Sequence, residues 1–408
     1  MKCRHCSADL ELNLIDLGSS PPSNAYLTED ALKAPEKWFP LRVLVCTECW
    51  LAQTEDYAGA DQLFDADYSY FSSFSDSWLR HAEEYVEKII AQLQLDANAH
   101  VVEVAANDGY LLQYFKARNI PCLGIEPTKG TADAARAKGI EIVESFFGVA
   151  LASELASQGR RADLMVANNV LAHVPDINDF VSGFRLLLKP HGVATFEFPH
   201  LMQLVDHAQF DTIYHEHFSY LSLSAVQRIF GNNGLQVFNV EEIPTHGGSL
   251  SVYAQIANSG QHAVSAAVTD LLARERAVGM TGGAYYRGFQ QKAERIKHDL
   301  LAFLLEAKRA NKKVMAYGAA AKGNTLLNYA GLRDDLLPLV VDRNPAKQNK
   351  FLPGSRIPVM DEAVIRNEKP DYILILPWNL KEEVVSQLSY IRDWGGQFVI
   401  AVPVLEIK

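Results

Sequence analysis

The sequence predicts an α/β protein in which a small cysteine-rich module precedes two domains built on doubly wound sheets. Four of the five cysteines form two CxxC pairs, and the segments 100–127 and 313–331 each read as an apolar strand, a glycine-containing turn and a helix. Strands that alternate with helices form right-handed crossovers in a parallel sheet. Because 408 residues exceed one core, we expect domains at 1–70, 71–260 and 261–408.

The composition describes a soluble globular chain. Hydrophobic residues make up 48% and charged residues 21%, and the net charge is −11. That charge disfavours a nucleic-acid surface, which needs clustered Lys and Arg. The N-terminus resembles no signal peptide, and no apolar run of about 18 residues follows. We expect a cytoplasmic protein, monomeric or a small homo-oligomer, without nucleic-acid or membrane partners.

The cysteine pairs, Cys3 with Cys6 and Cys46 with Cys49, are typical of a zinc site. Four thiolates close a tetrahedral shell, so we expect a structural Zn²⁺ and no catalytic water. A disulfide framework is the alternative. Residues 1–60 hold five Lys/Arg against nine Asp/Glu, which argues against a DNA-reading zinc ribbon. The long spacing between the pairs predicts an inserted segment around 17–27.

The segment 100–127 indicates an adenosine-binding unit. Its turn, residues 105–109, uses small residues where a ligand approaches the backbone, and Glu126 lies about 20 residues beyond the first strand, where an acid accepts hydrogen bonds from ribose. The GxGxxG pattern of dinucleotide sites is absent. S-adenosylmethionine (SAM), which has no pyrophosphate, therefore fits better than NAD.

Two further strands are predicted within 161–176 and 191–199. Asn168, Asn169 and His173 follow the first of them at its carboxyl end, the edge at which α/β sheets hold ligands. For His173 a helix-capping or core role is the alternative. The candidate cofactor-binding residues are Glu103, Ala105, Asn107, Asp108, Gly109, Glu126, Asn168 and Asn169.

The motif Tyr214-His215-Glu216-His217 places four proton-handling side chains in succession. Buried polar groups without partners each cost roughly 1–3 kcal/mol, so such a cluster is unusual in a core. In an extended segment His215 and His217 would share one face. A second metal site with His ligands is therefore an alternative, although no third ligand is evident.

The C-terminal third predicts helices around 268–277 and 286–313, followed by a second α/β unit. Gly318 and Gly323 have P-loop spacing, but Asn324 replaces the required lysine, which excludes an ATPase. Lys322 can still hold a phosphate at a helix N-terminus. Further strands are expected within 337–348, 370–379 and 396–407. The candidate substrate-binding cations of this region are Lys322, Arg343 and Lys347.

Several motifs together resemble the nucleotide-sugar C-methyltransferases. They are "EVAANDG", "GIEP", "NNVLAHVPD", "YHEHFSYLS", "HGGSLSVY" and "YGAAAKGNT", behind the paired CxxC. The resemblance implies a zinc-binding N-terminal domain, a class I SAM methyltransferase domain and a C-terminal Rossmann-like domain that helps to hold the nucleotide-sugar. The common ExGxGxG pattern is met only by Glu103 and Gly109, and ExAxNDG resembles the family's own version.

The resemblance also implies site residues. Tyr214, Glu216 and His217 match the family's Y-x-E-H sugar site, and His173 matches its histidine in "NNVLAHVPD". Tyr68, with Tyr70 as a rival, matches an active-site tyrosine that follows the zinc domain. His246, in "HGGSLSVY", is a further candidate substrate-binding residue.

The implied reaction is SAM-dependent methylation of a nucleotide-linked 4-keto-6-deoxysugar, which yields S-adenosylhomocysteine. A ketone acidifies the neighbouring carbon 3 hydrogen, and histidine, with a pKa of about 6.5, suits its removal. Tyrosine or imidazole donors can stabilise the enolate oxygen. Methylation at carbon 5, O- or N-methylation, and a non-catalytic scaffold are the alternatives.

Overall fold

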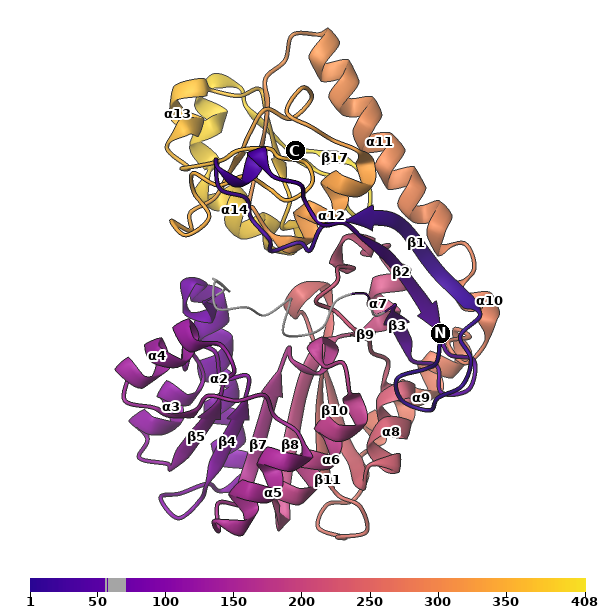
Figure 1. Ribbon diagram of the computed structural model, residues 1–408, viewed down its shortest axis with the longest axis vertical. Helices are drawn as coiled ribbons and strands as arrows, with labels where there is room; N and C mark the ends of the chain where they lie inside the picture. The colour runs from indigo at the N-terminus through magenta and orange to yellow at the C-terminus, as the bar shows by residue number, and fades with distance from the viewer. Residues whose placement is uncertain (56, 58–70) are drawn as a thin grey trace.

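The computed structural model describes residues 1–55, 57 and 71–408. A large sheet domain and a second α/β domain lie one above the other, and strands of the N-terminal module run alongside both (Figure 1). Tyr68 and its rival Tyr70 lie outside the described residues. The domain boundaries at 71 and 261 stay predictions.

The N-terminal module is an antiparallel sheet in the order β1-β2-β3-β9. Its strands are β1 (Leu12–Ser20), β2 (Phe39–Val45), β3 (Ala52–Thr54) and β9 (Ser219–Tyr220). β1 reaches into the segment predicted as an insertion, and the connection to β2 comprises residues 21–38. The fourth strand comes from the chain directly after the YHEH motif, so the module's sheet is completed by the predicted catalytic segment.

The middle domain is a seven-stranded sheet in the order β10-β11-β8-β7-β4-β5-β6. Its strands are β4 (Val101–Val104), β5 (Cys122–Ile125), β6 (Glu141–Val143), β7 (Ala162–Asn168), β8 (Leu188–Pro199), β10 (Leu235–Ile243) and β11 (Ser249–Ile256). The first five are parallel and the last two antiparallel. This confirms the class I SAM methyltransferase fold.

Helices cover both faces of this sheet (Figure 1). They are α2 (Asp76–Leu93), α3 (Leu112–Ala117), α4 (Lys129–Ala137), α5 (Val149–Ser157), α6 (Ile177–Leu187), α8 (Leu223–Asn232) and α9 (Ala266–Ala277). The short helix α7 (Leu201–Asp206) follows β8 and packs in the hydrophobic cluster that the N-terminal module shares with the C-terminal domain. The helices α2, α6 and α8 begin after Ser75, Asp176 and Ser222, whose side chains accept hydrogen bonds from first-turn amides. Such caps fix where each helix begins relative to the strand before it.

The C-terminal domain has a six-stranded sheet in the order β14-β13-β12-β15-β16-β17, parallel except for β17. Its strands are β12 (Val314–Tyr317), β13 (Val340–Val341), β14 (Val359–Met360), β15 (Tyr372–Ile375), β16 (Gln397–Ile400) and β17 (Glu406–Ile407). Its helices are α10 (Gly283–Tyr286), α11 (Phe289–Arg309), α12 (Ala321–Ala330), α13 (Val364–Glu368) and α14 (Lys381–Gln387). In chain order the strands run 3-2-1-4-5-6, the Rossmann arrangement.

The N-terminal module packs against both larger domains. Ile15, Val43 and their neighbours share one hydrophobic cluster with α11 and the C-terminal sheet. Leu44 and Leu51 belong to a second cluster, that of the middle domain. The described residues contain no helix that is both long and apolar enough to span a membrane.

Candidate active site

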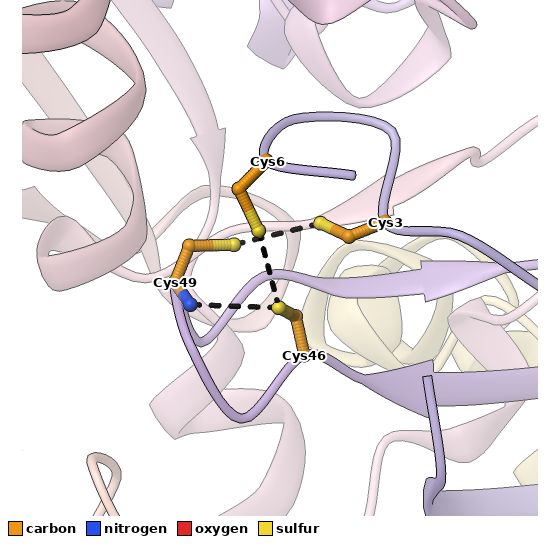
Figure 2. A group of neighbouring side chains, drawn as sticks. All are labelled: Cys3, Cys6, Cys46 and Cys49. Atoms are coloured by element: carbon orange, nitrogen blue, oxygen red, sulfur yellow. Dashed lines mark hydrogen bonds between the residues drawn. The ribbon is translucent and has the colours of Figure 1, made fainter. Parts of the chain in front are cut away.

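Four cysteines converge on one point of the N-terminal module (Figure 2). Their sulfur atoms lie within 4.8 Å of one another, and the Cys3–Cys49 and Cys6–Cys46 sulfur pairs are 3.5 Å apart. A tetrahedral zinc thiolate site has sulfur–sulfur edges of about 3.8 Å, so the residues fit Zn²⁺. Four thiolates would complete the shell, which makes the site structural. The sulfur separations also overturn the disulfide alternative, which requires about 2.05 Å.

The turn after β4 is held in an unusual backbone conformation. Ala105 and Asn107 have φ of 58° and 49°, in the left-handed region that non-glycine residues seldom adopt. Gly109 has φ of 74°, and a Cβ there would lie 2.4 Å from the Ile140 side chain. Such conformations cluster at ligand sites, where the surrounding structure enforces them.

Glu126 connects the carboxyl ends of β4 and β5. Its Oε2 accepts from the Asn107 amide at 2.9 Å, and its Oε1 accepts from the Thr128 amide at 3.0 Å. The side chain is only 4% exposed. Because each carboxylate oxygen can accept more than one hydrogen bond, Glu126 can hold the turn and a ribose hydroxyl together.

Several buried polar atoms at this edge have no partner within the described ranges. They are Asp108 Oδ1, Asn168 Nδ2 and both side-chain polar atoms of Asn169. An unsatisfied buried group costs roughly 1–3 kcal/mol, which a polar ligand would recover. These residues fit SAM, which supplies an electrophilic methyl group when bound. Glu103 differs, because burial raises its pKa well above the ordinary value and favours its neutral form.

The YHEH motif forms a tight turn, so the extended conformation considered for it is wrong. The His217 amide donates to the Tyr214 carbonyl at 2.9 Å, which closes the turn. The Tyr214 and His217 rings lie 3.9 Å apart between centroids, and the His173 ring lies 4.6 Å from His217. Among described residues the four cysteines are the sole metal-compatible cluster, which leaves the second metal site without support.

The hydrogen bond of His217 defines which nitrogen carries its proton. Nδ1 lies 2.8 Å from the Thr212 carbonyl, which can only accept, so Nδ1 is protonated and Nε2 keeps its lone pair. Burial lowers the pKa of His217 well below its ordinary value. The Nδ1 atom of His173 likewise lies 2.8 Å from the Glu216 carbonyl, and burial lowers the pKa of His173 to about 4. Both imidazoles are therefore neutral at pH 7.

The other two residues of the turn point elsewhere. His215 Nε2 lies 3.3 Å and 3.2 Å from the carbonyl oxygens of Phe39 and Pro40, so this ring faces β2 and packs structurally. Glu216 is 2% exposed, and its Oε1 accepts from the Asn24 amide at 3.1 Å. Its Oε2 has no partner in the part of the chain described.

Lys322 brings a half-buried cation to this centre from the C-terminal domain. Its Nζ donates to Asn379 Oδ1 at 2.6 Å and lies 4.5 Å from the centre of the Trp378 ring. Burial lowers the pKa of Lys322, whereas the charge of Asp211 opposes that shift. The Trp378 indole in turn donates to Asp211 Oδ2 at 2.7 Å. The lysine charge acts on His217 and His246 as well.

Of the two other predicted cations, Lys347 lies beside the glycine-rich turn after β12, residues 318–323. Lys347 Nζ donates to the Ala319 carbonyl at 2.8 Å. Arg343 lies in the loop after β13 and donates to Gln387 at 3.3 Å. Asp342, at the end of β13, accepts from the Ala319 amide at 2.7 Å. An acid at the end of the second Rossmann strand is the position that meets ribose hydroxyls in nucleotide sites.

Family models and a relative match nearly the whole of this chain. Models of a methyltransferase domain, a zinc-binding domain and a C-methyltransferase C-terminal domain match residues 78–240, 3–64 and 244–403. The C-methyltransferase NovU of Streptomyces niveus is 33% identical over 402 residues, which cover 98% of this chain and 95% of NovU. The chain belongs to the C-methyltransferase family. It is a SAM-dependent transferase with a zinc-binding domain.

Two solved structures that resemble this C-methyltransferase each cover less than half of it. The PH0226 protein of Pyrococcus horikoshii is 14% identical with a TM-score of 0.39, covering 46% of this chain and 95% of its own. The magnesium protoporphyrin IX methyltransferase of Synechocystis with bound SAM is 16% identical with a TM-score of 0.33, covering 45% and 82%.

A polar network beside the cofactor edge escaped the sequence analysis. His81 Nε2 and Thr245 Oγ1 lie 2.7 Å and 2.9 Å from the two carboxylate oxygens of Glu197. Trp78 stacks on His81 at 4.9 Å and meets the His246 ring at 5.3 Å. A lone glutamate near the carboxyl end of the apolar strand β8 was the available signal. No sequence signal pointed to Trp78 and His81 on α2, because only the fold brings these residues next to Glu197.

We expect Glu126→Ala to weaken SAM binding by roughly 10- to 150-fold, the effect of losing a charge-assisted acceptor. The same change would release the Asn107 amide and so loosen the turn. Isothermal titration calorimetry measures the affinity, and Glu141→Ala, an exposed position on β6, is the matched control. Equal SAM affinity in Glu126→Ala and wild type would contradict the placement.

The half-buried imidazole of His246 should make the fold sensitive to acid. Burial lowers its pKa to about 4, whereas the unfolded value is about 6.5, so the unfolded chain binds the proton first and stability falls below pH 6.5. At pH 5 this group should cost roughly 2 kcal/mol of unfolding free energy. His246→Asn, which tolerates the φ of 54°, should reduce the loss between pH 7 and pH 5 by that amount. Urea unfolding at both pH values checks it, and equal losses would contradict it.

Proposed function

We propose that this C-methyltransferase methylates carbon 3 of a nucleotide-linked 4-keto-deoxysugar. One observation carries the proposal: at the predicted catalytic turn a neutral, half-buried His217 has its Nδ1 held by the Thr212 carbonyl and its Nε2 left as a base. Carbon methylation needs a carbanion-like nucleophile, and a neighbouring ketone makes one accessible. The motif resemblance supports a substrate in which this ketone group is part of a sugar.

In this proposal each residue of the turn has its own role in proton removal or in binding the substrate. His217 Nε2 takes the proton from carbon 3, so the C–H electrons pass into the enolate and its negative charge gathers on oxygen 4. The Tyr214 hydroxyl, on the ring beside His217, is the donor assigned to that oxygen. His173, whose Nδ1 proton is held by the Glu216 carbonyl, contacts the His217 ring and positions it. Glu216 accepts from a sugar hydroxyl. Tyr68 keeps its predicted role as a further active-site tyrosine.

The nucleotide end would rest on the C-terminal domain. This domain has the Rossmann strand order. The acid Asp342 and the cation Lys347 both bond to Ala319 in the glycine-rich turn, and the cation Lys322 belongs to the same turn. A diphosphate supplies the negative charge that these lysines balance. His246 and Arg343 are the remaining candidate substrate-binding residues. An acidic protein thus has a local cationic site for an anionic substrate.

The test is incubation of the zinc-loaded protein with SAM and a panel of dTDP-, GDP- and CDP-linked 4-keto-6-deoxysugars. Mass spectrometry should detect the gain of one CH₂ in the sugar, and NMR of the product should place the new methyl on carbon 3. A methyl on carbon 5, oxygen or nitrogen would overturn the assigned position. No transfer, with no thermal shift by SAM or nucleotide, would favour the scaffold alternative.

A further inference from the structure

The connection between β1 and β2, residues 21–38, lies on the C-terminal domain although it belongs to the zinc-binding module (Figure 1). Leu27 and Phe351 exchange two backbone hydrogen bonds, at 2.9 Å and 2.8 Å. The Tyr26 hydroxyl donates to the Ala319 carbonyl at 2.5 Å. The Ser23 carbonyl accepts from the buried Asn324 side chain at 2.6 Å. The segment Ser23–Leu27 is therefore fixed on the glycine-rich turn and α12.

From this fixed segment Asn24 reaches the catalytic turn. Its Nδ2 donates to Glu216 Oε1 at 3.1 Å. Burial raises the pKa of Glu216, whereas the Asn24 side-chain donor lowers it. The bond holds Oε1, and Oε2 has no partner among the described residues.

The opposite side of the turn is held by different groups. The Thr54 hydroxyl of β3 donates to the His217 carbonyl at 3.0 Å, and the Thr325 hydroxyl of α12 donates to the Ile213 carbonyl at 2.8 Å. These bonds fix the backbone and do not touch the Glu216 carboxylate. Among the described residues Asn24 is the side-chain donor to that carboxylate, so the orientation of Oε2 depends on it.

We propose that Asn24 is a positioning residue that holds Glu216 Oε1 and so turns Oε2 toward a hydroxyl donor on the substrate. The inference rests on the proposed role of Glu216 in the substrate site. It makes the zinc-binding module a contributor to substrate recognition through a segment remote from the metal. It also defines the substrate class further, as a ketone that carries a free hydroxyl group.

A double-mutant cycle tests the proposal. Asn24→Leu, of similar size but without the donor, should lower kcat/KM by roughly 10- to 100-fold, and Asn24→Asp should lower it at least as far because it opposes two carboxylates. In a Glu216→Gln background Asn24→Leu should change kcat/KM by less than about twofold. SAM affinity and zinc content should stay at wild-type values. Asn13→Leu, at an exposed position of β1, is the control.

A second measurement does not depend on turnover. With ¹³C-labelled glutamate, the Glu216 carboxyl signal is assigned by its loss in Glu216→Gln, and its pKa should rise in Asn24→Leu. The charge of the same carboxylate acts on Tyr26 and Tyr220, and burial raises the pKa of both, so neither titrates in the range used. An unchanged Glu216 pKa with additive kinetic effects would overturn the positioning role. Failure of wild type to methylate any keto-sugar would overturn the proposed function alone, since the NMR result still decides the role of Asn24.

Discussion

Replacing His217 with asparagine should reduce turnover by roughly 10²–10⁴-fold while SAM affinity stays near the wild-type value. The asparagine amide can still donate to the Thr212 carbonyl, the partner of His217 Nδ1, so the turn should keep its shape. What is lost is the Nε2 lone pair. Single-turnover kinetics measure the methylation step, and calorimetry measures SAM binding.

The neighbouring His215 provides a matched control. Its ring bonds to the Phe39 and Pro40 carbonyls and faces away from His217. We expect His215→Asn to lower the melting temperature but to keep turnover within a few-fold of wild type, because surface or packing changes away from the reacting atoms do not remove the base.

A partial reaction separates proton removal from methyl transfer. Without SAM, wild type should exchange the carbon 3 hydrogen of the keto-sugar with deuterium from solvent, and His217→Asn should not. Undiminished exchange in the variant, with methylation abolished, would contradict the assignment and move the base to Tyr68, His173 or Tyr214. His217 would then be a binding residue.

Loss of zinc should also have a large effect, in this case on the stability of the folded protein. Binding of a structural Zn²⁺ contributes roughly 10–16 kcal/mol in small zinc domains, and that free energy is folding free energy. Cys3→Ser or Cys46→Ser should therefore lower zinc content and soluble yield together. Zinc quantification by atomic emission and thermal unfolding are the measurements, and Cys122→Ser, a half-buried thiol on β5, is the control.

The metal site is also connected to the catalytic turn. The Gln53 side chain donates to Cys3 Sγ at 3.2 Å, and the next residue, Thr54, donates to the His217 carbonyl at 3.0 Å. β3 pairs with β9 directly after the turn. We expect any zinc-free protein that remains soluble to lose turnover as well. A stable, metal-free Cys3→Ser variant with full activity would refute the structural role of zinc.

Local pattern was sufficient for much of the architecture. The CxxC pairs predicted the zinc cluster, and the strand–turn–helix segments at 100–127 and 313–331 predicted the two doubly wound sheets. Both signals are short in sequence, since a two-residue knuckle and a tight turn are each defined by neighbouring residues. The short motifs, including the one at Tyr214–His217, indicated the family because each of them also consists of neighbouring residues.

Only the tertiary structure decided how the site is assembled. Glu197 meets His81 across 116 positions, Asn24 meets Glu216 across 192, and Thr325 meets Ile213 across 112. No periodicity encodes such pairs, because they depend on how three domains pack around one turn. The same packing decided that the YHEH motif is a turn in which His217 lies beside Tyr214 and His215 points to β2. Burial then sets the charge states, since the fold determines which imidazoles and carboxylates lose their water.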